Sequence, residues 1–489
     1  MKKYSALLFL LFLVNTILLN AQDVESPEFK NDKSTFYRTL GAFNGNVYYY
    51  DVKRMKGGVK IIILKYKEST LELLEEKEVY SKLIKPKVFN DRCQVYGFHK
   101  NGNFYFFYSL IHSGDYHVSM VTIDENLTNS KENELGVIVE TGYELLGSFD
   151  VSLSPDCKSA VVALKNYCEG KKAIGTNTGV IFENTELVYV NLINQTVIYK
   201  KRLPIELKES RVKTEQYKTD NEGNVKLIIS ITDRKSLSSI KAIGFGFLNK
   251  EDKDLKINEI NTENSTSISS KLIQSKNGDL SYIGVLSNSI LLKILPVDKS
   301  KKWSEKSISK NGFESLGSYS TVLFRVAESE NGYYLTFFHS MFSNYEKQSV
   351  AFISKSGEFK WHKVLPVITP IHYNSNGNLG INSVYNNNKL FVFFVENKPY
   401  ELTKKVIKMI AENSLNGEYN NAKTNTVMVT IDENGQFEKR IIHDNAIYGD
   451  ENGDFGADPS DAQLIDDTNI LVLPIHGGKF LKLQKINLQ

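Results

Sequence analysis

The sequence predicts an all-β fold made of repeated four-stranded antiparallel units. Short apolar runs rich in β-branched and aromatic residues occur along most of the chain, as pleated sheet surfaces favour. Pairs of these runs are separated by tight turns rich in Asn and Gly, and the turns recur at nearly constant spacing. No long stretch has a convincing helical period with caps; Lys404 to Asn413 is the best helical candidate, and we expect it to lie inside a loop.

The turns that define the repeat are eight short polar segments, each between two strand-like runs. They are Asn44-Gly45-Asn46, Asn101-Gly102-Asn103, Pro155 to Lys158, Asn221 to Asn224, Asn277-Gly278-Asp279, Asn331-Gly332, Asn386 to Asn388 and Asp466 to Asn469. Most successive turns lie 54 to 57 residues apart, with wider gaps before Gly223 and before Asp467. This period is typical of repeat architectures.

Each unit is predicted to contain strand A, a tight turn, strand B, a variable loop, strand C, a short turn and strand D. In unit two these strands are Cys93 to Lys100, Asn103 to Ile111, Tyr116 to Asp124 and a more polar strand toward Val137. In unit six they are Thr321 to Ser329, Tyr333 to His339, Ser349 to Ser354 and Glu358 to Leu365.

Four-stranded antiparallel units at this spacing predict a β-propeller, in which radial closure leaves only short, protected sheet edges. The last unit, from Ala462, supplies strands A, B and C and ends at Gln489 without a strand D. The segment Asp23 to Lys33 could supply that strand and close the ring. We favour eight blades; seven blades or two packed β-domains remain as alternatives.

Two short segments resemble known propeller families. Ser154-Pro155-Asp156-Cys157-Lys158 resembles the Ser-Pro-Asp-Gly-Lys turn of TolB-type propellers, with Cys157 in place of the glycine. The run from Ala351 to Trp361 is similar to the C-to-D hairpin of quinoprotein-like repeats, in which a docking Trp follows the turn. Ile431 to Gln436 is similar but has no Trp, and Trp303 has the position equivalent to Trp361 one unit earlier. The resemblance implies propeller architecture and carries over neither an activity nor a quinone cofactor.

The N-terminus has the pattern of a cleavable signal peptide. Lys2 and Lys3 precede an apolar stretch from Ala6 to Leu19, and Asn20-Ala21-Gln22 offers a small residue for cleavage. The stretch is shorter than the roughly 20 apolar residues of a membrane-spanning helix, although an uncleaved anchor remains the alternative. We therefore expect residues 1–21 to be a signal peptide and residues 22–489 to form a single exported propeller, periplasmic or extracellular and without a transmembrane segment.

Composition excludes two further classes of protein. The chain has 60 Lys and Arg against 57 Asp and Glu, a balance that argues against a nucleic-acid partner. Its 3 Cys residues exclude a disulfide-dense scaffold. Cys157 and Cys168 flank an expected strand from Ser159 to Lys165 and should lie too far apart to bridge. Cys93 with Cys168 is the better pair, and three free thiols are the alternative.

Four long insertions predict one crowded face. Two of them, Asn166 to Thr185 and Glu396 to Asn425, connect strands B and C; the other two, Pro366 to Leu379 and His443 to Ser460, connect strand D to the next strand A. Both kinds of connection lie on the same face of a propeller, which we call the long-loop face. Loops of this length are usually functional or disordered. Five histidines in or beside these segments are candidates for a site there, namely His112, His339, His372, His443 and His476.

The segment from Asp450 to Asp461 is the sharpest chemical motif. Its oxygen-bearing side chains at positions 1, 3, 5, 9 and 12 match the ligand spacing of a calcium loop. They belong to Asp450, Asn452, Asp454, Asp458 and Asp461. Phe455 stands where such loops have Gly, and Asp461 replaces the usual Glu, so a solvated acidic loop is the alternative to a structural Ca²⁺ site.

These observations favour a binding or interaction module over an enzyme. The sequence has no Gly-x-Ser-x-Gly, Walker or Cys-x-x-Cys motif. We expect a monomeric exported propeller that engages a protein, glycan or small ligand through the long-loop face. A hydrolase or lyase with a site on that face, or a component of a cell-envelope assembly, are the alternatives.

Overall fold

The computed structural model describes the chain in segments. These are residues 24–25, 29–30, 37–55, 58–83, 94–100, 102–112, 115–128, 132–138, 148–169, 181–203, 206–207, 210–233, 240–251, 256–261, 269–275, 279–285, 289–295, 304–309, 320–340, 345–365, 369–370, 381–397, 424–445, 456–457, 463–464, 470–477 and 480–488. Within them the regular secondary structure consists of strands, and no helix is long and apolar enough to cross a membrane.

Seven four-stranded antiparallel blades follow one another along the chain, which is the alternative to the eight blades that the turns favoured. The first three consist of β3 (Tyr37–Phe43), β4 (Asn46–Met55), β5 (Gly58–Lys67) and β6 (Leu73–Leu83); β7 (Val95–Lys100), β8 (Asn103–His112), β9 (Asp115–Asp124) and β10 (Asn133–Ile138); and β11 (Ser148–Leu153), β12 (Ser159–Glu169), β13 (Ile181–Asn191) and β14 (Thr196–Arg202). The fourth consists of β16 (Ser210–Thr219), β17 (Val225–Asp233), β18 (Ile240–Leu248) and β19 (Lys256–Asn261), with the short β15 (Glu206–Leu207) beside β16.

The remaining three blades have the same order. They consist of β20 (Ser269–Gln274), β21 (Leu280–Val285), β22 (Ser289–Leu295) and β23 (Ser304–Ser309); β24 (Ser320–Glu328), β25 (Gly332–Ser340), β26 (Tyr345–Ser354) and β27 (Phe359–Val364), with β28 (Thr369–Pro370) beside β26; and β29 (Ile381–Asn386), β30 (Lys389–Asn397), β31 (Thr424–Asp432) and β32 (Phe437–Asn445). The strand bounds of units two and six confirm the predicted pattern to within a few residues.

An additional sheet joins the two ends of the chain. β35 (Ile470–Gly477) and β36 (Phe480–Asn487) pair with each other, and the short β33 (Gly456–Ala457) and β34 (Gln463–Leu464) pair with β35. β1 (Val24–Glu25) and β2 (Phe29–Lys30) pair with the outer side of β36. The prediction that the segment Asp23 to Lys33 supplies the missing outer strand is therefore confirmed.

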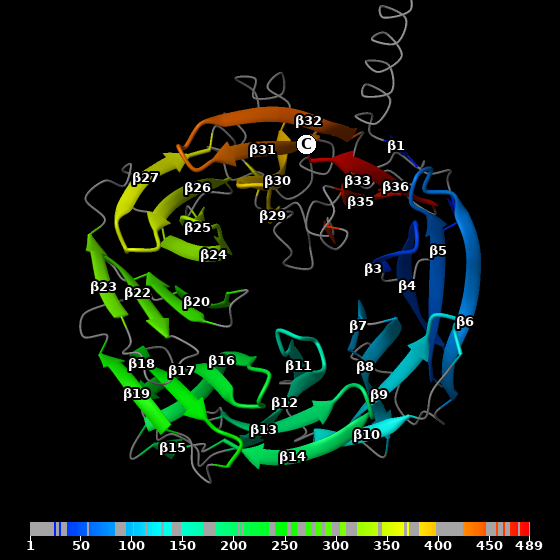
Figure 1. The fold of residues 1–489 in the computed structure, drawn as a ribbon, viewed down its shortest axis with the longest axis horizontal. Coiled ribbons are helices and arrows are strands. Elements are labelled where there is room, and N and C mark those ends of the chain that lie inside the picture. The colour runs from blue at the N-terminus through cyan, green and yellow to red at the C-terminus, as the bar shows by residue number, and fades with distance from the viewer. Residues whose placement is uncertain are drawn as a thin grey trace, which may run out of the picture.

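Side chains of β36 and of Leu488, which follows it, pack on both neighbouring blades. Leu483 lies in a cluster with β4 and β5, whereas Ile486 and Leu488 lie in a cluster with β30 and β31. Because this sheet contacts the first blade on one side and the seventh on the other, it closes the wheel seen in Figure 1. Strands β3, β7, β11, β16, β20, β24 and β29 lie nearest the axis in that view, and we call them the inner strands.

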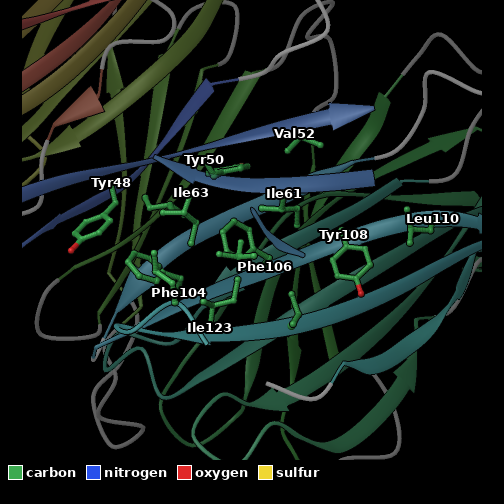
Figure 2. Close-up of a cluster of buried hydrophobic side chains, with 14 residues drawn as sticks. Tyr48, Tyr50, Val52, Ile61, Ile63, Phe104, Phe106, Tyr108, Leu110 and Ile123 are labelled. Carbon is green, nitrogen blue, oxygen red and sulfur yellow. The ribbon is translucent and has the colours of Figure 1, made fainter. Parts of the chain in front are cut away.

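Aromatic side chains fill the spaces between blades. Between the first two blades, Tyr50 packs edge-on against Phe106 with ring centroids 5.3 Å apart, and Ile61 and Ile63 lie beside them (Figure 2). Phe106 is fully buried. Burying one such side chain stabilises the fold by about 1.5–3 kcal/mol. The other interfaces between neighbouring sheets have buried apolar clusters of their own, so each interface is a separate hydrophobic core.

Two turns confirm the local features suggested by the family resemblances. Cys157 has φ 55°, the left-handed conformation that the turn glycine would otherwise supply. Trp361 donates from Nε1 to the Glu433 carbonyl at 2.8 Å, in the next blade. Its ring also lies against Gly435, so Trp361 docks one blade on the following one.

One predicted insertion is shorter than expected. The B-to-C loop of the third blade was expected from Asn166 to Thr185, but β12 continues to Glu169 and β13 begins at Ile181. The polar residue Asn166 pairs with Asn184 in the ladder, and Cys168 lies within β12 instead of after it. Cross-strand pairing here prevails over the weak strand preference of asparagine.

Candidate functional site

Polar side chains of one inner strand bind the main chain of the next. Gln216 on β16 donates from Nε2 to the Ser270 carbonyl at 3.1 Å and accepts at Oε1 from the Leu272 N–H at 2.8 Å. Ser269 accepts from the Leu323 N–H at 2.7 Å, and Arg325 donates to the Ser383 carbonyl at 2.7 Å. These bonds satisfy main-chain groups that have no further strand to pair with.

The inner strands carry an excess of positive charge. The seven of them contain seven Lys and Arg residues but only three Asp and Glu residues. Two of those acids are already paired, because Asp150 contacts Lys165 at 2.6 Å and Glu328 contacts Lys355. By sequence, the inner strands therefore carry a net positive charge.

A cavity of about 520 Å³ lies against these strands. It is lined by Pro155, Lys218, Leu272, Ile273, Gln274, Ser275 and Val326. Pro155 belongs to the turn between β11 and β12, and Lys218 and Gln274 lie at the ends of β16 and β20 that lead into tight A-to-B turns. The cavity thus lies at the tight-turn face, opposite the long-loop face.

Lys218 is the cationic group of this cavity. Its side chain is half-buried, and burial lowers the pKa of its amine below the ordinary 10.5. Within the described segments, no carboxylate lies within ion-pair distance of Lys218. An ammonium group that is partly removed from water and has no counterion gains from an anionic ligand.

A second pair of cations lies next to the cavity. Lys271 on β20 and Arg325 on β24 are close enough for the positive charge of Arg325 to act with burial in lowering the pKa of Lys271. These like charges on adjacent inner strands extend the positive potential away from Lys218 and across the next blade.

The register of β20 leaves main-chain groups facing the cavity. The Ser275 N–H bonds outward to the Asp279 carbonyl, whereas Ser270 and Leu272 bond inward to Gln216. Because main-chain direction alternates along a strand, Gln274 also faces inward. Within the described part of the chain, no hydrogen bond is made by the Leu272 carbonyl or the Gln274 N–H.

The candidate histidines of the long-loop face are only partly described. His112, His339, His443 and His476 have main chains near strand ends that lead to that face, in β8, β25, β32 and β35, and His372 lies outside the described residues. The four belong to different sheets. A histidine site on the long-loop face therefore stays a prediction.

The expected calcium ligands also lie outside the described residues. Asp450, Asn452, Asp454, Asp458 and Asp461 are not described, and of that loop only Gly456 and Ala457 are placed, as β33. Elsewhere in the described ranges, no group of three or more His, Cys, Asp or Glu side chains is arranged to hold a metal ion. The Ca²⁺ site stays a prediction.

Cysteine pairing is settled for one residue. Cys157 is a free thiol, and burial raises its pKa. Cys93 lies outside the described residues, and only the main chain of Cys168 is described. The pairing of Cys93 with Cys168 stays a prediction.

Comparison with known proteins adds three distant structural likenesses. No family model matches the chain, and no curated protein matches it. Prolyl oligopeptidase B from Galerina marginata is 11% identical with a TM-score of 0.43, over 93% of this chain and 55% of that one, so the chain spans about half of its length. Polysaccharide lyase Uly1 is 11% identical with a TM-score of 0.42, over 80% of this chain and 89% of the lyase. The β-propeller domain of the Trilobed protease from Pyrococcus furiosus is 10% identical with a TM-score of 0.39, over 86% of this chain and 98% of the domain.

These scores are too low to carry an argument about function. The strand order and the closing sheet identify the propeller, and the candidate site comes from this chain's own residues. Lys218, Lys271 and Arg325 are not among the site residues predicted from the sequence. The sequence signal for them is the presence of Lys and Arg within the predicted A strands. These strands form the inner edges of the blades, which have less water around them than the outer strands, so a cation there is unusual.

Proposed function

We propose that this chain is an exported β-propeller that binds an anionic ligand in the cavity at its tight-turn face. The observation that carries the proposal is Lys218, a half-buried amine that lines the cavity and has no carboxylate partner among the described residues. The basic inner strands support it, because their potential attracts anions toward the axis. This function is binding, and it places the ligand opposite the long-loop face.

Export is part of the proposal and rests on the N-terminal pattern. Lys2 and Lys3, the apolar stretch to Leu19 and the small residue Ala21 have the order of a secretory signal. Expression of the full chain in a secreting bacterial host should give a mature N-terminus at Gln22. Recovery of the protein from the membrane with Met1 retained would show an anchor instead.

Ligand binding can be tested on the Lys218 amine itself. An uncharged amine reacts with N-hydroxysuccinimide acetate, and a lowered pKa makes Lys218 more reactive near pH 8 than an ordinary lysine. We expect citrate to slow acetylation of Lys218, as measured by peptide mass spectrometry. The matched control is Lys363, an exposed lysine on β27, whose labelling should not change.

The neutral compound glycerol distinguishes anion binding from a general solvent effect. Slower labelling of Lys218 in citrate but not in glycerol supports the proposal. Citrate, phosphate and acetate are each added from about 10 mM to about 100 mM at constant ionic strength. The proposal is overturned if none of the three changes the labelling of Lys218.

A further inference from the structure

We infer that the ligand of this cavity is an elongated dianion, with one anionic group at Lys218, a second at Lys271 and Arg325, and an uncharged spacer between them. It rests on the proposed function, because Lys218 is again the anion-binding group, and it adds the chemical class of the ligand. Three features carry it: the places of the cations in the repeat, their lack of acidic partners and the apolar lining between them.

The three cations lie on the inner strands of three successive blades. Lys218 is the second-last residue of β16, whereas Lys271 and Arg325 are each the fourth residue from the end of their strands, β20 and β24. The α-carbons of Lys218 and Lys271 are therefore on the order of 10 Å apart, two residues along the strand direction and one sheet across. One carboxylate or phosphate group is too small to contact both amines at this spacing.

Packing of the blades gives no reason for an amine at the position of Lys218. The residues at the equivalent place in the next two blades are Ile273 and Ala327, counted from the strand ends. Both pack on the apolar cluster between their own blade and the following one. The interface is thus built with apolar side chains where the repeat has no ligand to bind, and the Lys218 amine is an addition to it.

The charge of Arg325 is not needed for its structural bond. Gln216 has the equivalent place in β16 and bridges to the Ser270 carbonyl with a neutral amide. Arg325 makes the corresponding bond to the Ser383 carbonyl. Since a guanidinium group has five N–H donors, this bond leaves others for a ligand.

Lys271 has the same place in β20 but makes no such bridge. The side-chain bond between β20 and β24 comes from Ser269, which accepts from the Leu323 N–H at 2.7 Å. Among the described residues Lys271 has no ion pair or side-chain hydrogen bond, and the nearby charge of Arg325 helps burial to lower the pKa of its amine. An anionic group between these two like charges would remove their repulsion.

The lining between the two ends is apolar and open to a ligand. Ile273 and Val326, from β20 and β24, line the cavity together with Lys218. Arg325 is exposed, and Lys218 and Lys271 are partly exposed, so a ligand can contact all three cations. A spacer without charge fits this lining, and a volume of about 520 Å³ is in the range of small-molecule sites.

Isothermal titration calorimetry with the protein recovered from the secreting host tests the inference. The probe is suberate, a linear diacid with a carboxylate at each end. Octanoate has the same chain length but one carboxylate, and succinate has two carboxylates that are too close together. At constant ionic strength we expect suberate to bind about 5- to 10-fold more tightly than either, the range for one or two partly exposed ion pairs.

Glutamine variants assign the second anionic group. Arg325→Gln removes the charge while its amide can keep the bridge to β29, as Gln216 does in β16. Arg325→Gln and Lys271→Gln should each bring the affinity for suberate closer to that for octanoate and change octanoate binding much less. Lys363→Gln on the outer strand β27 is the matched control and should bind both acids like the unmodified chain. Circular dichroism and the melting temperature establish that each variant is folded.

The outcomes separate the two proposals. Equal affinity for suberate and octanoate in the unmodified chain, or suberate binding that both glutamine variants leave unchanged, overturns the dianion inference. If citrate still slows acetylation of Lys218 in that case, the anion-binding function stands and its ligand is of another class. If suberate, citrate, phosphate and acetate all leave the labelling of Lys218 unchanged, both proposals fail.

Discussion

Replacement of Gln216 by Leu tests whether the side-chain amides between inner strands hold the wheel together. The substitution keeps the approximate volume and removes two hydrogen bonds, to the Ser270 carbonyl at 3.1 Å and from the Leu272 N–H at 2.8 Å. Each is worth about 0.5–1.5 kcal/mol net. These net values already include the exchange of each bond with water, so we expect the local free energy of opening to fall by about 1–3 kcal/mol in total.

Hydrogen exchange followed by mass spectrometry or NMR measures this effect at a single amide. A loss of 1.4 kcal/mol corresponds to about a tenfold change in an equilibrium constant, so the Leu272 amide should exchange roughly 5- to 100-fold faster in Gln216→Leu. The neighbouring Ile273 faces β21 in the sheet ladder and is the internal control. Its exchange should change much less.

Gln216→Glu provides a graded comparison. The carboxylate keeps an acceptor for the Leu272 N–H but loses the donor to the Ser270 carbonyl, so Leu272 should stay more protected than in Gln216→Leu. Unchanged exchange of the Leu272 amide in Gln216→Leu would refute the reasoning, because the side-chain bond would then contribute nothing to protection of the inner edge.

Three further predictions concern stability. Gly435→Ala should destabilise the fold by about 1–3 kcal/mol, because φ is +76° and the new Cβ would lie 3.0 Å from Trp361. Gly45→Ala is the control for backbone strain alone, since Gly45 has φ +71° and no atom within 4 Å of the new Cβ. Equal melting temperatures of the two variants would contradict a role for the Trp361 contact. Alkaline pH should destabilise the fold above about pH 10, because burial and hydrogen bonding raise the pKa of Tyr108 above its ordinary 10.0, so that the phenol ionises in the unfolded chain before it ionises in the folded one. The contribution of Tyr108 to stability is therefore complete below that pH and is lost above it. Tyr108→Phe should flatten the fall in the denaturation midpoint between pH 9 and 11 (about one unit either side of the ordinary pKa), and an unchanged slope would count against this prediction. Finally, EGTA should lower the melting temperature if the loop from Asp450 to Asp461 holds Ca²⁺, and an Asp450→Asn variant should no longer respond to the chelator; an identical melting temperature with and without EGTA rules the site out.

Much of the fold follows from local signals in the sequence. Turn residues such as Asn44-Gly45 adopt the positive φ angles that their types favour, and the alternating apolar runs beside them form the expected strands. The closing strand was predictable as well, because a final unit without an outer strand requires one from elsewhere. These features depend on neighbours within a few residues or on the count of strands.

The candidate site was not predictable in the same way. Lys218 lies in a run of alternating polar residues that is equally typical of an exposed strand, and its burial depends on β20, which follows more than fifty residues later. The extension of β12 through Asn166 could not be predicted for a similar reason. Asn166 pairs with Asn184, and neither polar residue indicates a strand by its type. Partners distant in the sequence decide both cases: a strand of the next blade for Lys218 and the paired strand of the same sheet for Asn166.

The sheet formed by both chain ends imposes an order on assembly. Val24 is paired with Lys485, so β1 has no partner until nearly all of the polypeptide is available for folding. Until then, the apolar sides of the first and seventh blades have no neighbour to cover them, and loop closure over this distance is slow. A chain truncated before Phe480 would lack β36, so the apolar side chains of the first and seventh blades that Leu483, Ile486 and Leu488 cover would stay exposed.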